Sequence, residues 1–267
     1  MKSLTELPSE YKCHQNFYRM AWGDLTCREC GDKRLLFRET YEYCPHCKRK
    51  FSAKADSKLF KFSNLSFRQI YALIWCWQHK CSIGEIKNIL GLSYPTVSNW
   101  LRKLRQALPA SQPALEGDIE VDGSYFGRRR FGRQRLVIGA ISPKTKQIRL
   151  KIIKYRNRAE AESFIQDTVK IGSIVSTDGF KGYNELPLLG YIWQNCDHSI
   201  GCFGPTNHIE NLWSVIKRAL RYMYRDLTFS VRDLELILRE WENRHNNPEL
   251  FYNEDDYLKM ACFGLFR

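Results

Sequence analysis

Residues 119–135 read IEVDGSYFGRRRFGRQR, and this stretch decides how the second half of the chain folds. Apolar residues surround Asp122 in a run that is typical of a strand. Five arginines then occur within eight residues: Arg128, Arg129, Arg130, Arg133 and Arg135. A carboxylate embedded in an apolar strand beside a dense cationic loop stabilises a core poorly, but it suits a metal-binding acid that meets a polyanion. An arginine-rich, solvated hairpin is the alternative.

The segments after this stretch extend the strand pattern. RLVIGAIS and QIRLKIIK predict two more strands, residues 158–171 predict a helix, and SIVSTD predicts a strand that ends at Asp178. This order indicates an α/β sheet covered by helices. The first and fourth strands can be neighbours in such a sheet, which would bring Asp122 and Asp178 together. Two close carboxylates imply either a raised pKa or a divalent metal between them.

A third acid comes from residues 206–225, TNHIENLWSVIKRALRYMYR, whose periodicity predicts an amphipathic helix. Glu210 and Lys217 are seven residues apart, nearly two helical turns, so they share one face. Arg221 lies another turn along. The helix therefore presents an acid toward the metal site, and Lys217 and Arg221 are placed to bind phosphate beside it.

Two CxxC pairs precede these elements. Cys27 and Cys30 are followed at a short distance by Cys44 and Cys47, with alternating and aromatic residues between the pairs. This spacing predicts a zinc ribbon with a structural Zn²⁺ held by four thiolates, rather than four incidental cysteines. The basic strip that follows is either a solvated face or a phosphate contact; it comprises Lys48, Arg49, Lys50, Lys54, Lys58 and Lys61.

Helical periodicity continues in three pieces, at about 66–79, 82–90 and 94–107. Gly91 closes the second piece, and Ser93 with Pro95 opens the third. The pattern fits a helix-turn-helix, whose last helix enters the major groove of DNA. The predicted DNA-reading residues are Thr96, Ser98, Asn99 and Arg102. An ordinary packing unit of three helices is the alternative reading.

The positive net charge of the chain favours an acidic binding partner. The chain of 267 residues has a formal charge of +13, and residues 1–115 carry 19 Lys/Arg against 9 Asp/Glu. Nucleic acid is the favoured partner, with an anionic membrane surface as the competing one. No apolar run is long enough for a membrane span, and the N-terminus lacks a signal-peptide core, so we expect an intracellular protein without a membrane partner.

The motifs EVDGSYFGRRR, STDGFKGY and GPTNHIENLWSVIKR, behind a ribbon and a helix-turn-helix, resemble DDE transposases of the Merlin type and their bacterial ISXO2-like relatives. The resemblance implies an RNase H-like core in which Asp122, Asp178 and Glu210 hold two Mg²⁺ or Mn²⁺ ions. Lys217 matches the basic residue that follows the third acid. Some bacterial relatives use Asn as the third residue, which leaves Asn207 or His208 as alternatives to Glu210.

The resemblance also implies cut-and-paste transposition by end cleavage and strand transfer. The partners would be double-stranded DNA, as terminal inverted repeats and as target, with a homodimer or larger assembly on it. The location would be the nucleus in a eukaryote or the cytoplasm and nucleoid in a bacterium. The expected domains are a zinc ribbon at 24–55, a helix-turn-helix region at 63–108, a linker at 109–118, the catalytic domain at 118–250 and a C-terminal tail at 251–267.

Two other functions stay open on the sequence. One is a domesticated DNA-binding regulator whose transposase core is inactive, although the complete set of acids weighs against it. The other is a structure-selective nuclease with the same metal site but without end-specific binding or strand transfer.

Overall fold

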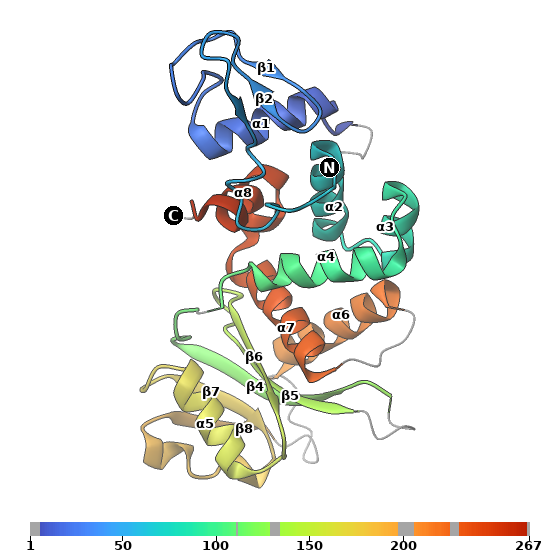
Figure 1. Cartoon of the computed structure of the whole chain (residues 1–267). Coiled ribbons are helices and arrows are strands. Elements are labelled where there is room, and N and C mark those ends of the chain that lie inside the picture. Colours follow the sequence, from blue (N-terminus) through green and yellow to red (C-terminus); the bar gives the residue numbers. More distant parts are fainter. Residues whose placement is uncertain (1–5, 111, 129–133, 197–205, 225–229, 266–267) are drawn as a thin grey trace. The chain divides into compact units, whose positions relative to one another are not determined.

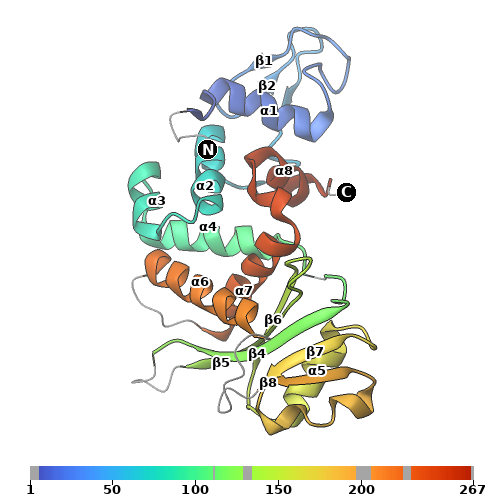
Figure 2. The ribbon, with the colours of Figure 1, turned by 180° about the vertical axis from the view of Figure 1, so that it is seen from behind.

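A computed structural model describes residues 6–110, 112–128, 134–196, 206–224 and 230–265. The chain divides into two compact units (Figures 1 and 2). The first unit comprises Met1–Ala107 together with Glu249–Arg267, and the second comprises Leu108–Pro248.

The second unit is built on a mixed sheet of five strands in the order β6-β5-β4-β7-β8. β4 pairs antiparallel with β5 and parallel with β7, so the sheet changes from antiparallel to parallel at β4. The strands are β4 (Asp118–Phe126), β5 (Arg135–Ile141), β6 (Ile148–Ile153), β7 (Ile174–Asp178) and β8 (Ile192–Cys196). The expected strands and the mixed α/β class are confirmed; β8 was not predicted.

Helices cover both faces of this sheet (Figures 1 and 2). Alternate side chains of β5 enter different cores: Leu136 and Ile138 pack with α5 residues, whereas Val137 and Ile141 pack with residues of α6 and α7. A strand buried on both faces must be apolar at successive positions, as RLVIGAI is. The helices are α5 (Arg158–Thr168), α6 (Asn207–Met223) and α7 (Val231–Asn246).

Helix α7 also satisfies the edge of the sheet at β6. The Leu150 N–H donates to Glu242 Oε1 at 2.6 Å, and the Ile148 N–H donates to Asn246 Oδ1 at 2.9 Å. Asn246 Nδ2 in turn donates to the Ile148 carbonyl at 3.0 Å. These side chains occupy backbone groups that an unprotected edge strand would offer to another chain.

The first unit contains a small antiparallel sheet and several helices. Its strands are β1 (Leu36–Phe37), β2 (Glu42–Tyr43) and β3 (Lys50–Phe51), and its helices include α1 (Glu10–Trp22), α2 (Phe67–Gln78), α3 (Ile83–Leu90) and α4 (Tyr94–Gln106). The three helices expected from periodicity are confirmed as α2, α3 and α4. Capping boxes begin α2 at Ser66 and α3 at Ser82, while Ser93 caps α4 and Gly91 ends α3 with φ of 65°.

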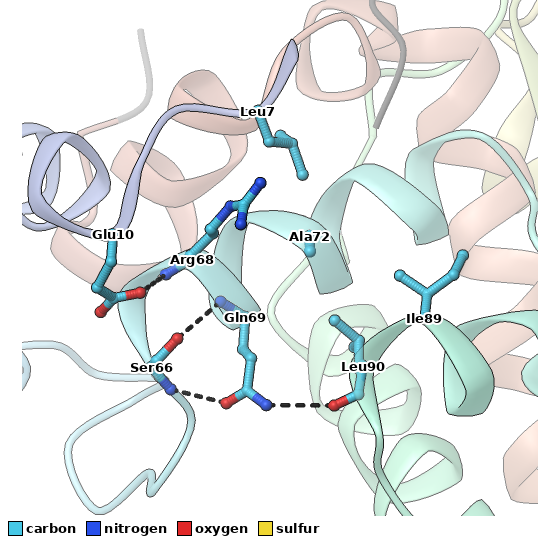
Figure 3. Close-up of a pocket in the computed structure, with 8 residues that line it drawn as sticks. All are labelled: Leu7, Glu10, Ser66, Arg68, Gln69, Ala72, Ile89 and Leu90. Atoms are coloured by element: carbon cyan, nitrogen blue, oxygen red, sulfur yellow. Dashed lines mark hydrogen bonds between the residues drawn. The ribbon is translucent and has the colours of Figure 1, made fainter. Parts of the chain in front are cut away.

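Glu10 of α1 and Gln69 of α2 tie α1, α2 and α3 together (Figure 3). The Glu10 carboxylate accepts the backbone N–H groups of Phe67 at 2.8 Å and of Arg68 at 2.7 Å, so one helix caps the next. Gln69 Nε2 donates to the Leu90 carbonyl at the end of α3 at 3.2 Å.

The C-terminal segment belongs to the core of the first unit. Helix α8 (Glu254–Leu258) continues into a π-helical turn at Lys259–Phe263. Tyr257 is fully buried, and its hydroxyl donates to the Leu104 carbonyl of α4 at 2.7 Å. Among the helices that the structure describes, none is long and apolar enough to cross a membrane.

Candidate active site

Asp122 and Asp178 lie at corresponding places on neighbouring strands. The parallel pairing of β4 and β7 matches Val121 with Thr177, and the two aspartates are the next residues along each strand. Asp122 lies within β4, whereas Asp178 ends β7. The strand order thus brings together two of the acids that the sequence singled out.

The electrostatics of Asp122 link it to both other acids. Burial raises the pKa of the Asp122 carboxyl, and the negative charges of Asp178 and Glu210 raise it further. Hydrogen bonds from the Gly123 backbone and the Trp213 indole oppose these effects. Mutual repulsion of this kind would be relieved by a cation held among the carboxylates.

Glu210 lies in the first turn of α6, which follows the Thr206 cap. The Thr206 hydroxyl donates to Glu210 Oε1 at 2.9 Å. The open alternatives, Asn207 and His208, are the first two residues of the helix. His208 contacts Glu120 of β4 through its backbone N–H and its ring Nδ1.

Glu120 anchors the start of α6 to β4. Its Oε2 accepts the backbone N–H groups of His208 at 2.8 Å and Ile209 at 2.9 Å, and its Oε1 lies 2.7 Å from His208 Nδ1. Glu120 is only 5% exposed, so a buried carboxylate provides the cap that the Thr206 side chain does not. This residue was missed in the sequence, although it stands two positions before Asp122 and therefore on the same face of the strand.

Trp213 holds Asp122 from the other side. Its indole Nε1 donates to Asp122 Oδ2 at 3.1 Å, and the ring is buried. Gly139, which pairs with Asp122 across β4 and β5, leaves room for that ring. A Cβ at Gly139 would lie 2.6 Å from Trp213 Cη2. The bond from Trp213 to Asp122 was not predicted from the sequence.

Lys217 is also directed toward this site. Its Nζ donates to Ser124 Oγ of β4 at 2.6 Å and lies 5.5 Å from the centroid of the Phe126 ring. Desolvation lowers the pKa of Lys217, the charge of Asp122 raises it, and the nearby charge of Arg221 lowers it. Lys217 thus interacts electrostatically with both Asp122 and Arg221.

Asp178 has a cationic partner that sequence reasoning missed. Arg156 Nη2 donates to Asp178 Oδ2 at 2.7 Å, and the guanidinium lies 4.8 Å from the centroid of the Phe180 ring.

Among the described residues, only a group of four cysteines brings three or more potential metal ligands within 4.8 Å of one another. Asp122, Asp178 and Glu210 are therefore more widely spread, each held by its own hydrogen-bond donor.

The four cysteines are Cys27, Cys30, Cys44 and Cys47, and their sulfur atoms all lie within 4.8 Å of one another. Cys27 Sγ lies 3.6 Å from Cys47 Sγ, and Cys30 Sγ lies 3.6 Å from Cys44 Sγ. Four clustered thiols fit the tetrahedral set that Zn²⁺ prefers, so this group could bind zinc.

The other predicted contacts lie in several places. Arg128 and Arg221 are exposed, Arg135 opens β5 opposite Phe126, and Arg129, Arg130 and Arg133 lie outside the described residues. On α4, Asn99 is exposed, and Thr96, Ser98 and Arg102 are partly exposed. The opposite side of the helix is buried at Val97, Trp100, Leu101 and Leu104.

Residues 114–244 match the model of the ISXO2-like transposase domain family. A relative described as "Uncharacterized protein in transposable element ISH50", from Halobacterium salinarum, is 23% identical over 142 residues. That match covers 51% of this chain and 48% of the relative, so the chain spans about half the length of the curated relative it matches. These two matches support a DDE transposase family for the domain at residues 114–244.

Two solved structures are similar to this chain at low identity. One is the simian T-cell lymphotropic virus intasome in complex with PP2A regulatory subunit B56 gamma, with a TM-score of 0.37, 12% identity and coverage of 65% of this chain and 68% of that chain. The other is the HTLV-2 integrase catalytic core domain in complex with magnesium, with a TM-score of 0.33, 13% identity and coverage of 48% and 86% respectively.

Proposed function

We propose that this protein is a cut-and-paste DNA transposase that cleaves the ends of its element and joins them to target DNA by metal-dependent phosphodiester chemistry. The observation that carries the proposal is the parallel pairing of β4 with β7, which places Asp122 and Asp178 at matched positions on neighbouring strands. Glu210, in the first turn of α6, is near enough for its charge to raise the pKa of the Asp122 carboxyl. A transposase domain match over residues 114–244 supports the same reaction class.

An RNase H-like core is the fold that we infer for the second unit. The sheet order β6-β5-β4-β7-β8, with antiparallel pairing on one side of β4 and parallel pairing on the other, supports this inference. In it, the first acid lies on the central strand, the second ends the neighbouring parallel strand and the third begins a covering helix.

The donor set fits hard divalent cations, because carboxylate oxygens are the ligands that Mg²⁺ and Mn²⁺ prefer. Asp122, Asp178 and Glu210 would hold two such ions. When bound, the ions would supply an activated water or 3′-hydroxyl and stabilise the leaving oxygen of an in-line displacement. Burial and the neighbouring acids raise the pKa of the Asp122 carboxyl, and a bound cation would lower it again by offsetting their repulsion.

The chain's own residues then position the acids and the DNA. Glu120 fixes the helix that carries Glu210, and Trp213 orients the Asp122 carboxylate. Arg156 neutralises Asp178, and because its side chain is 48% exposed it can turn outward to a DNA phosphate when a metal takes its place. Lys217, Arg221 and Arg128 would attract the scissile strand, with Arg129, Arg130, Arg133 and Arg135 as further phosphate contacts.

We further propose that α3 and α4 form a helix-turn-helix that reads the terminal repeats through Thr96, Ser98, Asn99 and Arg102, beside a zinc ribbon held by the four cysteines. Ser93 Oγ lies 2.8 Å from Thr96 Oγ1, which fixes the start of the reading helix. The DNA ends would be paired by a homodimer or a larger assembly.

Labelled terminal-repeat duplexes incubated with Mg²⁺ or Mn²⁺ and unlabelled target DNA test the proposal. We expect metal-dependent cleavage and joined products from the wild type and neither from Asp178→Ala. Sequence-specific binding without products would favour the DNA-binding regulator. Cleavage that follows DNA structure instead of end sequence, without joining, would favour the nuclease.

A further inference from the structure

A basic, aromatic cavity of about 670 Å³ lies within the first unit. Three segments form its walls: the loop that follows the small sheet, the last turns of α4 and the C-terminal π-helical turn. None of its lining residues is acidic; they are Lys58, Leu59, Lys61, Phe62, Ser63, Trp100, Lys103, Gln106, Ala107, Met260 and Ala261. Neither the acid cluster nor the DNA-reading residues proposed above belong to this lining.

The loop is held firmly beneath the cavity. The Lys58 N–H donates to the Cys262 carbonyl at 3.0 Å, and the Ser63 N–H donates to the Phe60 carbonyl at 2.9 Å. Phe60 is fully buried and stacks on Trp100, with ring centroids 5.1 Å apart and an interplanar angle of 24°. The backbone of the loop is thus held at Lys58, Phe60 and Ser63, on both sides of Phe62.

Phe62 is 91% exposed, although it lies only two residues after the fully buried Phe60. A large apolar ring fully in water contributes nothing to the core, and exposed aromatic residues in a basic setting are typical of surfaces that stack on nucleobases. Lys61 Nζ lies 5.5 Å from the centroid of the Phe62 ring, and Lys103 Nζ lies 4.4 Å from that of Trp100.

Charge complementarity selects a polyanion for this cavity. Lys58, Lys61 and Lys103 line the cavity, and no carboxylate in the lining neutralises them. A single strand of nucleic acid suits both the lysines and the exposed ring of Phe62, because it offers negatively charged phosphates and flat base surfaces at regular intervals. Paired bases inside a duplex do not present that surface, whereas an unpaired nucleotide does.

We propose that this cavity binds an unpaired nucleotide of DNA, with its base stacked on Phe62 and its flanking phosphates on Lys58, Lys61 and Lys103. The proposal rests on the proposed function only for the identity of the partner as DNA. It adds a site for single-stranded DNA that is separate from the acid cluster and from the duplex-reading helix. An acidic peptide is the competing occupant, and it would not require an exposed ring.

The test measures binding of the full-length protein to a fluorescein-labelled oligothymidine strand by fluorescence anisotropy at fixed salt. Phe62→Ala should weaken this binding by about fivefold or more, because stacking of one base on an aromatic ring contributes about 1–3 kcal/mol. Tyr252→Ala is the matched control, since Tyr252 is 77% exposed in the same unit and does not line the cavity. Both variants should retain the wild-type fold.

Lysine variants test the phosphate contacts. Lys61→Ala should weaken oligothymidine binding and reduce its salt dependence, whereas Lys12→Ala, at an exposed position of α1 outside the cavity, should change neither. Ultraviolet crosslinking followed by mass spectrometry should place the attached thymine on a peptide that contains Phe62.

Unchanged oligothymidine binding by Phe62→Ala, or an equal loss with Tyr252→Ala, would overturn the proposal. Binding of polyglutamate as tight as that of oligothymidine, with the same loss in Lys61→Ala, would assign the cavity to an acidic peptide instead. Metal-dependent cleavage of a blunt terminal-repeat duplex serves as the independent readout. If Phe62→Ala alters neither property, this inference fails and the proposed function stands; if the wild type never cleaves, the proposed function fails while the strand-binding result still decides the cavity.

Discussion

Glu120 of β4 binds His208 of α6 through two separate contacts, from the backbone N–H at 2.8 Å and from ring Nδ1 at 2.7 Å. The neighbouring Ile209 N–H reaches the same carboxylate at 2.9 Å. These bonds attach the first turn of the helix that carries Glu210 to the strand that carries Asp122. The distance between the proposed metal ligands Asp122 and Glu210 therefore depends on Glu120, which is not itself proposed to bind metal.

Glu120→Ala should reduce metal-dependent cleavage by about tenfold or more, because a small displacement of a catalytic group has a large effect on rate. It should also destabilise the second unit by about 1–3 kcal/mol, since the buried Ile209 N–H loses its acceptor. Cleavage rates and urea unfolding measure the two effects. Glu116→Ala, at an exposed glutamate, is the control, and wild-type cleavage by Glu120→Ala would show that the anchor is dispensable.

Gly139→Ala should lower stability by about 1–3 kcal/mol and impair cleavage, because the new methyl group overpacks a filled site. Its Cβ would meet the buried Trp213 ring at 2.6 Å and so displace the donor to Asp122. Thermal unfolding and the cleavage assay report both changes. The matched variant is Gly123→Ala on β4, where the nearest atom would be 3.7 Å from the added Cβ. Equal behaviour of the two variants would contradict the steric account.

Glu242 should make stability depend on pH. Burial raises the pKa of its carboxyl from 4.5 to about 7, although the Leu150 N–H bond and the charge of Arg149 oppose the shift. The folded state thus holds this proton more tightly than the unfolded state, so the stabilisation is fully present below pH 4.5 and is lost as pH rises through about 7.

We expect the Glu242 contribution to the free energy of unfolding to decline by up to about 3 kcal/mol across that window. Glu242→Gln keeps an acceptor for the Leu150 N–H but cannot ionise, so urea unfolding at several pH values should show a flatter profile. Glu235→Gln, at an exposed position of the same helix, should retain the wild-type profile. The same slope in Glu242→Gln and wild type would assign the pH dependence to another group.

Removal of one cysteine ligand should release zinc and unfold the ribbon. Cys30→Ser leaves three thiols in a group of four whose sulfur atoms lie within 4.8 Å of one another. Because structural zinc contributes folding energy directly, residues 24–55 should become sensitive to protease while the second unit stays folded. Zinc content by a chromogenic chelator and limited proteolysis measure this. Cys81→Ser, outside the cluster, should keep its zinc; no zinc in the wild type would refute the assignment.

Much of this fold follows from local sequence signals. Ser66 with Gln69 and Ser82 with Glu85 are capping boxes, and they begin α2 and α3 within one residue of the positions that periodicity predicts. The apolar run of β5 likewise predicts a strand buried on both faces. Helix α1 was not predicted, although Ser9 caps it and its buried face includes Phe17 and Tyr18.

The candidate site was predictable only in part. Asp122 and Asp178 each stand within or at the end of a strand, so a neighbouring arrangement of those strands suffices to bring them together. Glu120 and Arg156 depend on contacts across the fold, from β4 to α6 and from the segment after β6 to the end of β7. Spacing along the chain gives no measure of such contacts. The sequence did place Glu120 two residues before Asp122, which puts both side chains on the same face of β4.

The central claim is that three acids from β4, β7 and α6 act together on DNA. The most direct measurement is the rate of Mg²⁺- or Mn²⁺-dependent cleavage of a terminal-repeat duplex by Asp122→Asn, Asp178→Asn and Glu210→Gln. Asp167→Asn, at an aspartate whose side chain is 60% exposed on α5, serves as the control. We predict that each of the three variants loses cleavage while binding the duplex as the wild type does, and that the control cleaves normally. Cleavage retained by Glu210→Gln would contradict the claim and move the third role to Asn207 or His208.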